Sequence, residues 1–337
     1  MRVLVTGSAG LIGTWLTRQL HDKGHHVIGI DDLSGGTLSY SDGCYKEFYQ
    51  KDLTQDYAAS LVKSIGADVV YHCACHPREG LSSFCPTDIA AKSTCLATMN
   101  TLVGAINGGC KTFVQMSSMA RYGDAAGGTP PFEESCPCTP SDPYGAAKLC
   151  CDQWVKILCD THGVRWNIAI PHNAFGEYVA TYDPYRNVIA IWANRMLRGK
   201  KPLIYGDGSQ ERAPSYMRNW LEPMLRLGLD NSISGEIVNI GGERAVTINE
   251  LCEMVMHSFG WSDGAEYAEA RPNEVHIAHC SVAKSERLLG YKDEVSLEEG
   301  IQKTVDWIKS IGPVEPRFLE KYEIDNLVPR VWKERLV

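Results

Sequence analysis

The sequence lacks the usual features of membrane, secreted and nucleic-acid-binding proteins. No run of 18 apolar residues occurs, so we expect no membrane-spanning segment. The first residues, MRVLVTG, lack a basic stretch followed by a long apolar run, so we expect no secretory signal. Positive charge is scarce, because 33 Lys and Arg stand against 41 Asp and Glu, a net charge of −8. This balance argues against nucleic acid or an anionic membrane as the main partner.

Paired cysteine motifs are also missing. The chain has 13 cysteines, an odd number, and none of them forms the C-x2-C pattern of a zinc site. Cys73 and Cys75 are two residues apart, and Cys150 is next to Cys151. We therefore expect reduced thiols that pack as small apolar side chains, no bound metal, and a cytoplasmic location.

What the sequence does contain is an alternation of short β-branched runs and longer amphipathic stretches. The runs predict buried strands, and a long helix is expected from 143 to about 162. Such alternation is typical of right-handed βαβ units, and it predicts an α/β fold with a doubly wound parallel sheet covered by helices on both faces. The predicted strands are 2–7, 26–31, 68–73, 112–118 and 166–171.

The pattern becomes irregular after residue 173. Loops rich in Gly, Pro, Asp and Tyr are interleaved with predicted helices near 187–199, 218–229 and 248–259. We therefore divide the chain into a doubly wound domain, 1–172, and a smaller lobe, 173–337, from which some segments return to the sheet. The proline-containing tail from about 312 suggests no function beyond a possible docking segment.

A glycine-rich turn follows the first predicted strand. Gly7, Gly10 and Gly13 lie between that strand and a helix, where glycine allows a tight turn, a close approach to a pyrophosphate and close helix packing. Asp31 ends the second strand about 20 residues on, where a ribose-binding carboxylate is expected. This carboxylate repels a 2′-phosphate, and DDLSGG offers no cation, so NAD is favoured over NADP. Asp32 is either a further cofactor contact or a solvated loop acid.

A second motif lies on the long helix. Tyr144 and Lys148, at i and i+4, share one helix face. An adjacent ammonium and a positively charged nicotinamide ring would stabilise a phenolate and lower the tyrosine pKa. Ser118 ends a parallel strand at the sheet edge where ligands of such folds bind, so it is placed to hydrogen-bond a reacting hydroxyl.

Together these motifs resemble the extended short-chain dehydrogenase/reductase family, and within it the nucleotide-sugar epimerases and dehydratases. The resemblance runs from residue 1 to about 310 and implies a Rossmann domain in 1–172 and a nucleotide-sugar lobe in 173–337. It implies Ser118, Tyr144 and Lys148 as catalytic residues. Cofactor contacts implied are Gly7, Gly10, Leu11, Ile12, Gly13, Asp31, Asp32, Asp52, Leu53, Cys73, Ala74, Ser117, Tyr144, Lys148 and Pro171.

The later motifs of the family imply the substrate site. IPHNAFG resembles the segment whose Asn, here Asn173, lies at the sugar-nucleotide diphosphate, and DPYRNVI the segment whose Asn187 contacts the base. Arg212 and Arg271 match diphosphate-binding arginines, and guanidinium groups suit phosphate oxygens. Glu274 matches a ribose-binding acid. The full implied set is Ser118, Met119, Arg121, Tyr144, Asn173, Asn187, Val188, Tyr205, Arg212, Arg271 and Glu274.

One position favours a particular chemistry. Sugar 4,6-dehydratases of this family carry an Asp-Glu pair after the catalytic Ser or Thr, whereas this chain has Met119 and Ala120, which cannot move a proton. The resemblance therefore implies NAD-dependent 4-epimerisation of a nucleotide-diphosphate sugar, with a UDP-sugar such as UDP-glucose or UDP-galactose favoured. The sugar C4 would be oxidised and then reduced on its other face. A homodimer through the helices after 87 and after 143 is also implied.

Alternatives remain open because several positions depart from the family pattern. Arg121 occupies a place that is usually small or apolar, and CACHPREG places His76, Arg78 and Glu79 near the expected nicotinamide and sugar. The alternatives are a 4-epimerase of a UDP-uronic acid or UDP-N-acetyl sugar, another nucleotide-sugar oxidoreductase, or an NAD-binding regulatory protein without turnover.

Overall fold

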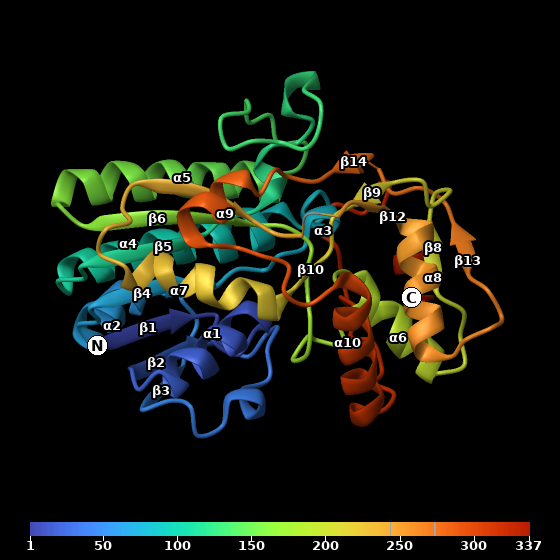
Figure 1. Cartoon of the computed structure of the whole chain (residues 1–337), viewed down its shortest axis with the longest axis horizontal. Helices are drawn as coiled ribbons and strands as arrows, with labels where there is room; N and C mark the ends of the chain where they lie inside the picture. The colour runs from blue at the N-terminus through green and yellow to red at the C-terminus, as the bar shows by residue number, and fades with distance from the viewer. Residues whose placement is uncertain (243, 273) are drawn as a thin grey trace.

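A seven-stranded parallel sheet lies at the centre of the fold (Figure 1). The structure, a computed structural model, describes residues 1–242, 244–272 and 274–337. Across the sheet, the strands are β11 (Glu236–Ile240), β6 (Arg165–Pro171), β5 (Thr112–Met116), β4 (Val69–His72), β1 (Arg2–Thr6), β2 (His26–Asp31) and β3 (Glu47–Gln50).

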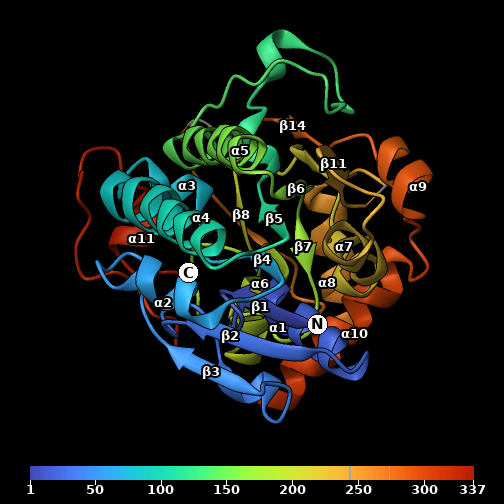
Figure 2. The ribbon, with the colours of Figure 1, turned by 90° about the vertical axis from the view of Figure 1, so that its left-hand side faces the viewer.

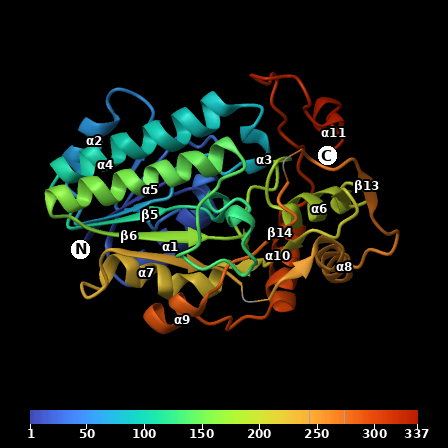
Figure 3. The ribbon, with the colours of Figure 1, turned by 90° about the horizontal axis from the view of Figure 1, so that it is seen from above.

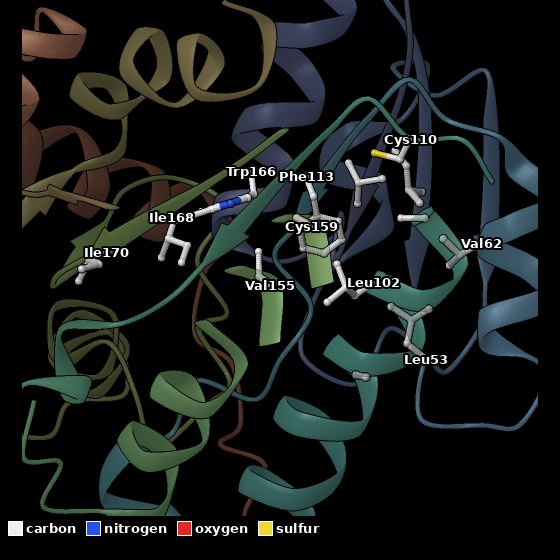
Figure 4. Close-up of a cluster of buried hydrophobic side chains, with 14 of the residues drawn as sticks. Leu53, Val62, Leu102, Cys110, Phe113, Val155, Cys159, Trp166, Ile168 and Ile170 are labelled. Atoms are coloured by element: carbon white, nitrogen blue, oxygen red, sulfur yellow. The ribbon is translucent and has the colours of Figure 1, made fainter. Parts of the chain in front are cut away.

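Helices cover both faces of this sheet (Figures 2 and 3). One face carries α2 (Ala58–Ile65), η2 (Thr87–Leu96), α4 (Ala97–Asn107) and α5 (Pro143–His162). The other carries α1 (Leu11–Asp22), α7 (Leu221–Leu229) and α9 (Ala283–Leu289). Each face of the sheet has its own hydrophobic core, and successive side chains of a strand point into opposite cores. In β1, Leu4 packs on the first face, and Val3 and Val5 pack on the second. Figure 4 shows the first core, in which Phe113, Val155 and Trp166 meet.

A smaller lobe lies beyond the carboxyl ends of the strands, on the right in Figure 1. Its helices are α6 (Val188–Leu197), α8 (Ile248–Phe259) and α10 (Leu297–Ile311). Its short strands pair as β8 (Leu203–Tyr205) with β13 (Glu266–Ala268), β9 (Glu211–Arg212) with β12 (Val246–Thr247) and β14 (Ile277–Ala278), and β7 (Ala174–Phe175) with β10 (Ser215–Tyr216). The remaining elements are η1 (Leu38–Ser41), α3 (Glu79–Ser82), η3 (Met119–Arg121), η4 (Ala125–Gly127), η5 (Met217–Trp220) and α11 (Arg330–Lys333).

The predicted α/β fold with a doubly wound parallel sheet is confirmed. Two strands of the sheet had not been located from the sequence. β3 (EFYQ) is a half-exposed edge strand, so its side chains do not form the apolar run of a buried strand. β11 (EIVNI) comes from the second half of the chain and pairs with β6 across about 70 residues.

The continuous helix formed by η2 and α4 bears on the expectation that no segment spans a membrane. Residues 87–107 are long and apolar enough to cross a membrane by length and composition, with a mean hydropathy of 1.2 over 18 residues. Half of that window is buried inside the fold. Because α4 packs on α2 and η2 packs on α5, the segment has the surroundings of a core helix.

Candidate active site and cofactor cleft

A cavity of about 510 Å³ opens at the carboxyl ends of the strands and extends to the smaller lobe. This edge of a parallel sheet is where α/β folds bind their ligands. Every cofactor, catalytic and substrate residue inferred from the sequence lines the cavity, with the exception of Arg121.

The glycine turn has the close packing that its sequence predicts. Gly7 has a φ of 63°, and a Cβ there would lie 2.7 Å from the Ala74 nitrogen. A Cβ on Gly13 would lie 2.1 Å from the Gly7 carbonyl oxygen, so only glycine lets α1 start here. No side chain among the described residues caps α1, which leaves its first N–H groups free to bind a pyrophosphate.

Asp31 is held rigidly beside this turn. Its carboxylate accepts hydrogen bonds from the N–H groups of Ala9 at 2.9 Å and Leu33 at 2.7 Å. Burial raises the pKa of Asp31, and these two N–H groups oppose the rise. The glycine cradle, the uncapped helix end and this acid fit the pyrophosphate and adenine ribose of NAD.

The start of α5 places two of the predicted catalytic side chains. Asp142 caps the helix by accepting a hydrogen bond from the Gly145 N–H at 2.9 Å, and Pro143 occupies the first turn. Tyr144 and Lys148 then point inward, with exposed fractions of 3% and 1%. The Lys148 ammonium lies 5.7 Å from the Tyr144 ring centroid and donates to the Met116 carbonyl at 2.7 Å. This bond fixes the ammonium beside the phenol.

The electrostatics around Tyr144 differ from the sequence expectation. Burial raises its pKa well above the usual value, and the neighbouring Cys75 and Glu79 raise it further. Lys148 keeps its charge: burial opposes the ammonium, but Cys75, Cys151 and Asp152 outweigh burial and raise its pKa. Turning Tyr144 into a base therefore requires positive charge beside its ring.

The two predicted diphosphate arginines meet at the other end of the cavity. Arg212 donates to Glu274 at 3.3 Å and to the Val275 carbonyl at 2.9 Å, while Arg271 pairs with the same Glu274 carboxylate. Arg271 also lies 5.1 Å from the ring centroid of Tyr205. The shared carboxylate holds both guanidinium groups against the cavity, and this is the role that the structure shows for Glu274.

The two predicted asparagines lie between these ends and both have positive φ. Asn187 (φ 62°) caps α6 by accepting from the Ala190 N–H and donates to the Ala174 carbonyl at 3.0 Å. Asn173 (φ 49°) approaches the Met119 sulfur at 3.8 Å. Asparagine tolerates this conformation better than most residues, so backbone geometry adds a second reason for both.

The structure does not bring Arg121 to the substrate. Its guanidinium is 4% exposed and donates to Asp152 at 2.8 Å, inside the protein. The same carboxylate oxygen accepts from Ser117 at 2.6 Å. The prediction that Arg121 contacts the substrate is therefore wrong, because the guanidinium faces the interior and forms a buried ion pair there.

Sequence reasoning missed a buried charge cluster on the cavity wall. The Asp183 side chain is fully buried and accepts from Arg78 at 2.9 Å, and Arg186 approaches it at 3.1 Å. Arg186 also donates to the Gly35 carbonyl at 2.9 Å, beside the Asp31 turn. Only the fold brings these segments together, although the departure of Arg78 from the family pattern was a signal.

The C-terminal segment, residues 313–337, completes the cavity wall and contacts both parts of the fold. Glu323 accepts from the Thr87 and Asp88 N–H groups at 2.8 and 2.9 Å, at the start of η2. Trp332 lines the cavity and donates to the Tyr205 hydroxyl at 2.9 Å. In Figure 3 this segment, with α11, lies at the upper right, above the smaller lobe. The sequence had suggested no more than docking.

Comparison with known proteins decides the family. The model of the NAD dependent epimerase/dehydratase family matches residues 3–241. The chain belongs to this family. The cofactor of this family member is NAD, and it is an NAD-dependent sugar-nucleotide enzyme.

Relatives within the family differ in their sugars. The chain is 30% identical to a putative UDP-glucose 4-epimerase of Methanocaldococcus jannaschii, over 91% of this chain and 98% of the relative. It is 29% identical to a UDP-glucuronate 4-epimerase of Thermodesulfobacterium geofontis, over 91% and 95%. The crystal structure of a Thermotoga maritima UDP-glucose 4-epimerase with UDP-glucose superposes with a TM-score of 0.83 at 27% identity, covering 92% and 99%.

Proposed function

We propose that this family member is a UDP-sugar 4-epimerase and that UDP-glucose and UDP-galactose are its substrate pair. The observation that carries the proposal is the length of one continuous cavity, with Tyr144 and Ser118 at one end and Arg212 and Arg271 at the other. A diphosphate bound by the two arginines tethers a sugar whose far side reaches the tyrosine. Such a tether holds the sugar in place while its C4 is oxidised and reduced.

The residues of the chain have separate tasks in this reaction. Tyr144 takes the proton of the C4 hydroxyl and later returns it to the 4-keto sugar, and Ser118 orients that oxygen by a hydrogen bond. Lys148 stabilises the phenolate form of Tyr144, since its ammonium is fixed beside the ring. NAD, when bound, supplies the hydride acceptor and donor and a positively charged nicotinamide ring.

Incubation with UDP-glucose, or with UDP-galactose, and a trace of NAD⁺ tests the proposal. We expect both reactions to reach the same mixture of the two sugars, measured by NMR of the anomeric protons, without net NADH at 340 nm. Net NADH without an epimer would instead indicate an oxidoreductase. A product lighter by one water would indicate elimination, and no turnover of any UDP-sugar would indicate a binding protein.

The hydrogen bond from Trp332 to Tyr205 should support the binding of the substrate. Replacing Trp332 by Phe keeps an aromatic ring on the cavity wall but removes the donor to Tyr205, which contacts Arg271. We expect KM for the UDP-sugar to rise roughly 2- to 10-fold, the equivalent of one hydrogen bond, with a smaller change in kcat. The control is Trp261→Phe, which removes a hydrogen bond to the Gly264 carbonyl at a tryptophan that does not line the cavity. If Trp332→Phe lowers kcat and thermal stability without raising KM, the hydrogen bond does not position the substrate site.

Two expectations stay predictions, namely the homodimer and the cytoplasmic location. The helices proposed for the dimer expose Leu96, Val103 and Ile157, with exposed fractions of 41%, 36% and 57%. These side chains lie on η2, α4 and α5 and would be covered by a second copy.

A further inference from the structure

Glu79 is a carboxylate in the catalytic cavity to which the proposed reaction assigns no task. It is the first residue of α3 and lines the cavity, and its Oε1 accepts from the Ser118 hydroxyl at 3.5 Å. The negative charge of Glu79 raises the pKa of Tyr144. The positive charges of Arg212 and Arg271 in turn lower the pKa of Glu79. Glu79 therefore lies between the reacting end and the diphosphate end, beside the region that the sugar ring must cross.

The surrounding hydrogen bonds hold Glu79 against the catalytic helix. The Ser82 hydroxyl donates to the Glu79 carbonyl at 2.7 Å and contacts the Asp142 carboxylate at 3.2 Å. The same hydroxyl accepts from the Tyr144 N–H at 3.2 Å. A single serine therefore joins the start of α3 to the start of α5, so the backbones of Glu79 and Tyr144 keep a fixed relation.

Charges of opposite sign are separated along the cavity. Glu79 and Asp142 lie at the catalytic end, and the arginines Arg212 and Arg271 lie at the other end with Glu274. A further arginine of the cavity wall, Arg78, is already paired with the buried Asp183. Next to Glu79 the cavity thus offers acceptors for a hydrogen-bond donor and no uncommitted guanidinium for an anion, among the residues that the structure describes.

We propose that Glu79 selects the sugar: its carboxylate accepts a hydrogen bond from a hydroxyl of an uncharged sugar and repels the carboxylate of a uronic acid. This inference rests on the proposed function and names the residue that would restrict it to neutral sugars. A hydroxyl donating to a carboxylate makes a strong, charge-assisted hydrogen bond. A uronate in the same ring position places two negative charges within a few ångströms of each other, which is repulsive at this distance although the Glu79 side chain is exposed to the water of the cavity.

The titration of Glu79 gives this selection a pH dependence. Desolvation by the surrounding protein and the like charge of Asp142 raise the pKa of Glu79 to about 6, against the opposing effects of Arg212, Arg271 and Ser118. Tyr144 is the other titratable group that faces it, and burial raises the pKa of that phenol. Both sugars react through the same Tyr144, so its ionisation cancels in the ratio of their rates. Glu79 is therefore neutral at pH 5 and charged at pH 8, so discrimination against uronates should increase between these values.

The test compares kcat/KM for UDP-glucose and UDP-glucuronate in the wild-type holoenzyme and in Glu79→Gln, with products quantified by NMR. Glutamine keeps the size and a carbonyl acceptor but removes the charge. We expect the wild type to prefer UDP-glucose by roughly 100-fold or more at pH 8, and the variant to reduce this ratio by roughly 10- to 100-fold. The wild-type ratio should fall at pH 5, whereas the ratio of the variant should not change with pH.

A matched control and distinct outcomes keep the inference separate from the proposed function. Glu253→Gln removes an equal charge from the exposed side of α8 and should leave the ratio unchanged. A wild type that prefers UDP-glucose, with the same substrate ratio in Glu79→Gln, would overturn only the role of Glu79. A wild type that prefers UDP-glucuronate would overturn both that role and the assigned pair of substrates. A wild type that epimerises no UDP-sugar would overturn the proposed function itself.

Discussion

Replacing Tyr144 by phenylalanine should lower kcat for 4-epimerisation by roughly 10²- to 10⁴-fold, the usual contribution of a positioned general acid-base group. The phenol is 3% exposed and loses only its oxygen in this change, so its ring still fills the wall. KM and the affinity for NAD should change little, because the arginines and the glycine turn are untouched. Steady-state rates and fluorescence titration of NAD measure these quantities.

The pH profile gives a second check of the same residue. Burial raises the pKa of Tyr144, so the protonated phenol is the form that dominates at neutral pH and the phenolate that accepts the proton is scarce. A cation beside the ring lowers this pKa, and the rate should rise with pH as Tyr144 ionises around the lowered value. Tyr267→Phe, which removes an exposed hydroxyl on β13, should have the wild-type profile. A Tyr144→Phe enzyme with wild-type kcat would contradict the assignment of the base.

The sequence predicted the parts of the site that lie within a single turn or a single helix. The glycine turn follows from Gly7 and Gly13, because backbone atoms occupy the space that a side chain would need. The limits of α5 follow from the Asp142 cap and from Gly163, whose φ of 69° ends the helix. Tyr144 and Lys148 then share a face by helical spacing alone.

Contacts between distant segments could not be predicted in this way. Trp332 meets Tyr205 across 127 residues, and nothing in a proline-containing tail indicates which tyrosine it will contact. Glu79 meets Ser118 across 39 residues, and only the observation of a charged residue in a usually apolar segment pointed toward it. Arg121 is a different kind of error. A charge three residues after the predicted catalytic serine suggested a ligand contact, but its partner is Asp152, 31 residues away in α5.

The buried pair of Arg121 and Asp152 leads to the second prediction with a large effect. Both side chains are almost fully buried, at 4% and 1% exposed, and burial raises the pKa of Asp152 to about 6 against the opposing effects of Arg121, Ser117 and Lys148. Replacing Arg121 by Met leaves a buried carboxylate without its cation. We expect a loss of roughly 3–5 kcal/mol in the free energy of unfolding at pH 8, measured by chemical denaturation.

The sign of the pH dependence separates this structural role from a role in binding the sugar. The folded-state pKa of Asp152 is above its unfolded value of 3.8, so its stabilising proton is held at low pH and lost as the pH rises through about 6. Without Arg121 the pKa of Asp152 rises further. At pH 8 the folded variant must then either bury an unpaired carboxylate or take up a proton on Asp152. The difference between wild type and Arg121→Met should therefore be small at pH 5 and large at pH 8.

A second substitution at Asp152 tests the cause of that loss. In Arg121→Met combined with Asp152→Asn, the amide still accepts from Ser117 but carries no charge, so most of the stability lost at pH 8 should return. Other titrating groups, such as Glu79, are common to all variants and cancel in the differences. If Arg121→Met instead raises KM for the UDP-sugar while the free energy of unfolding stays unchanged at both pH values, the guanidinium acts on the ligand and the buried pair does not explain its presence.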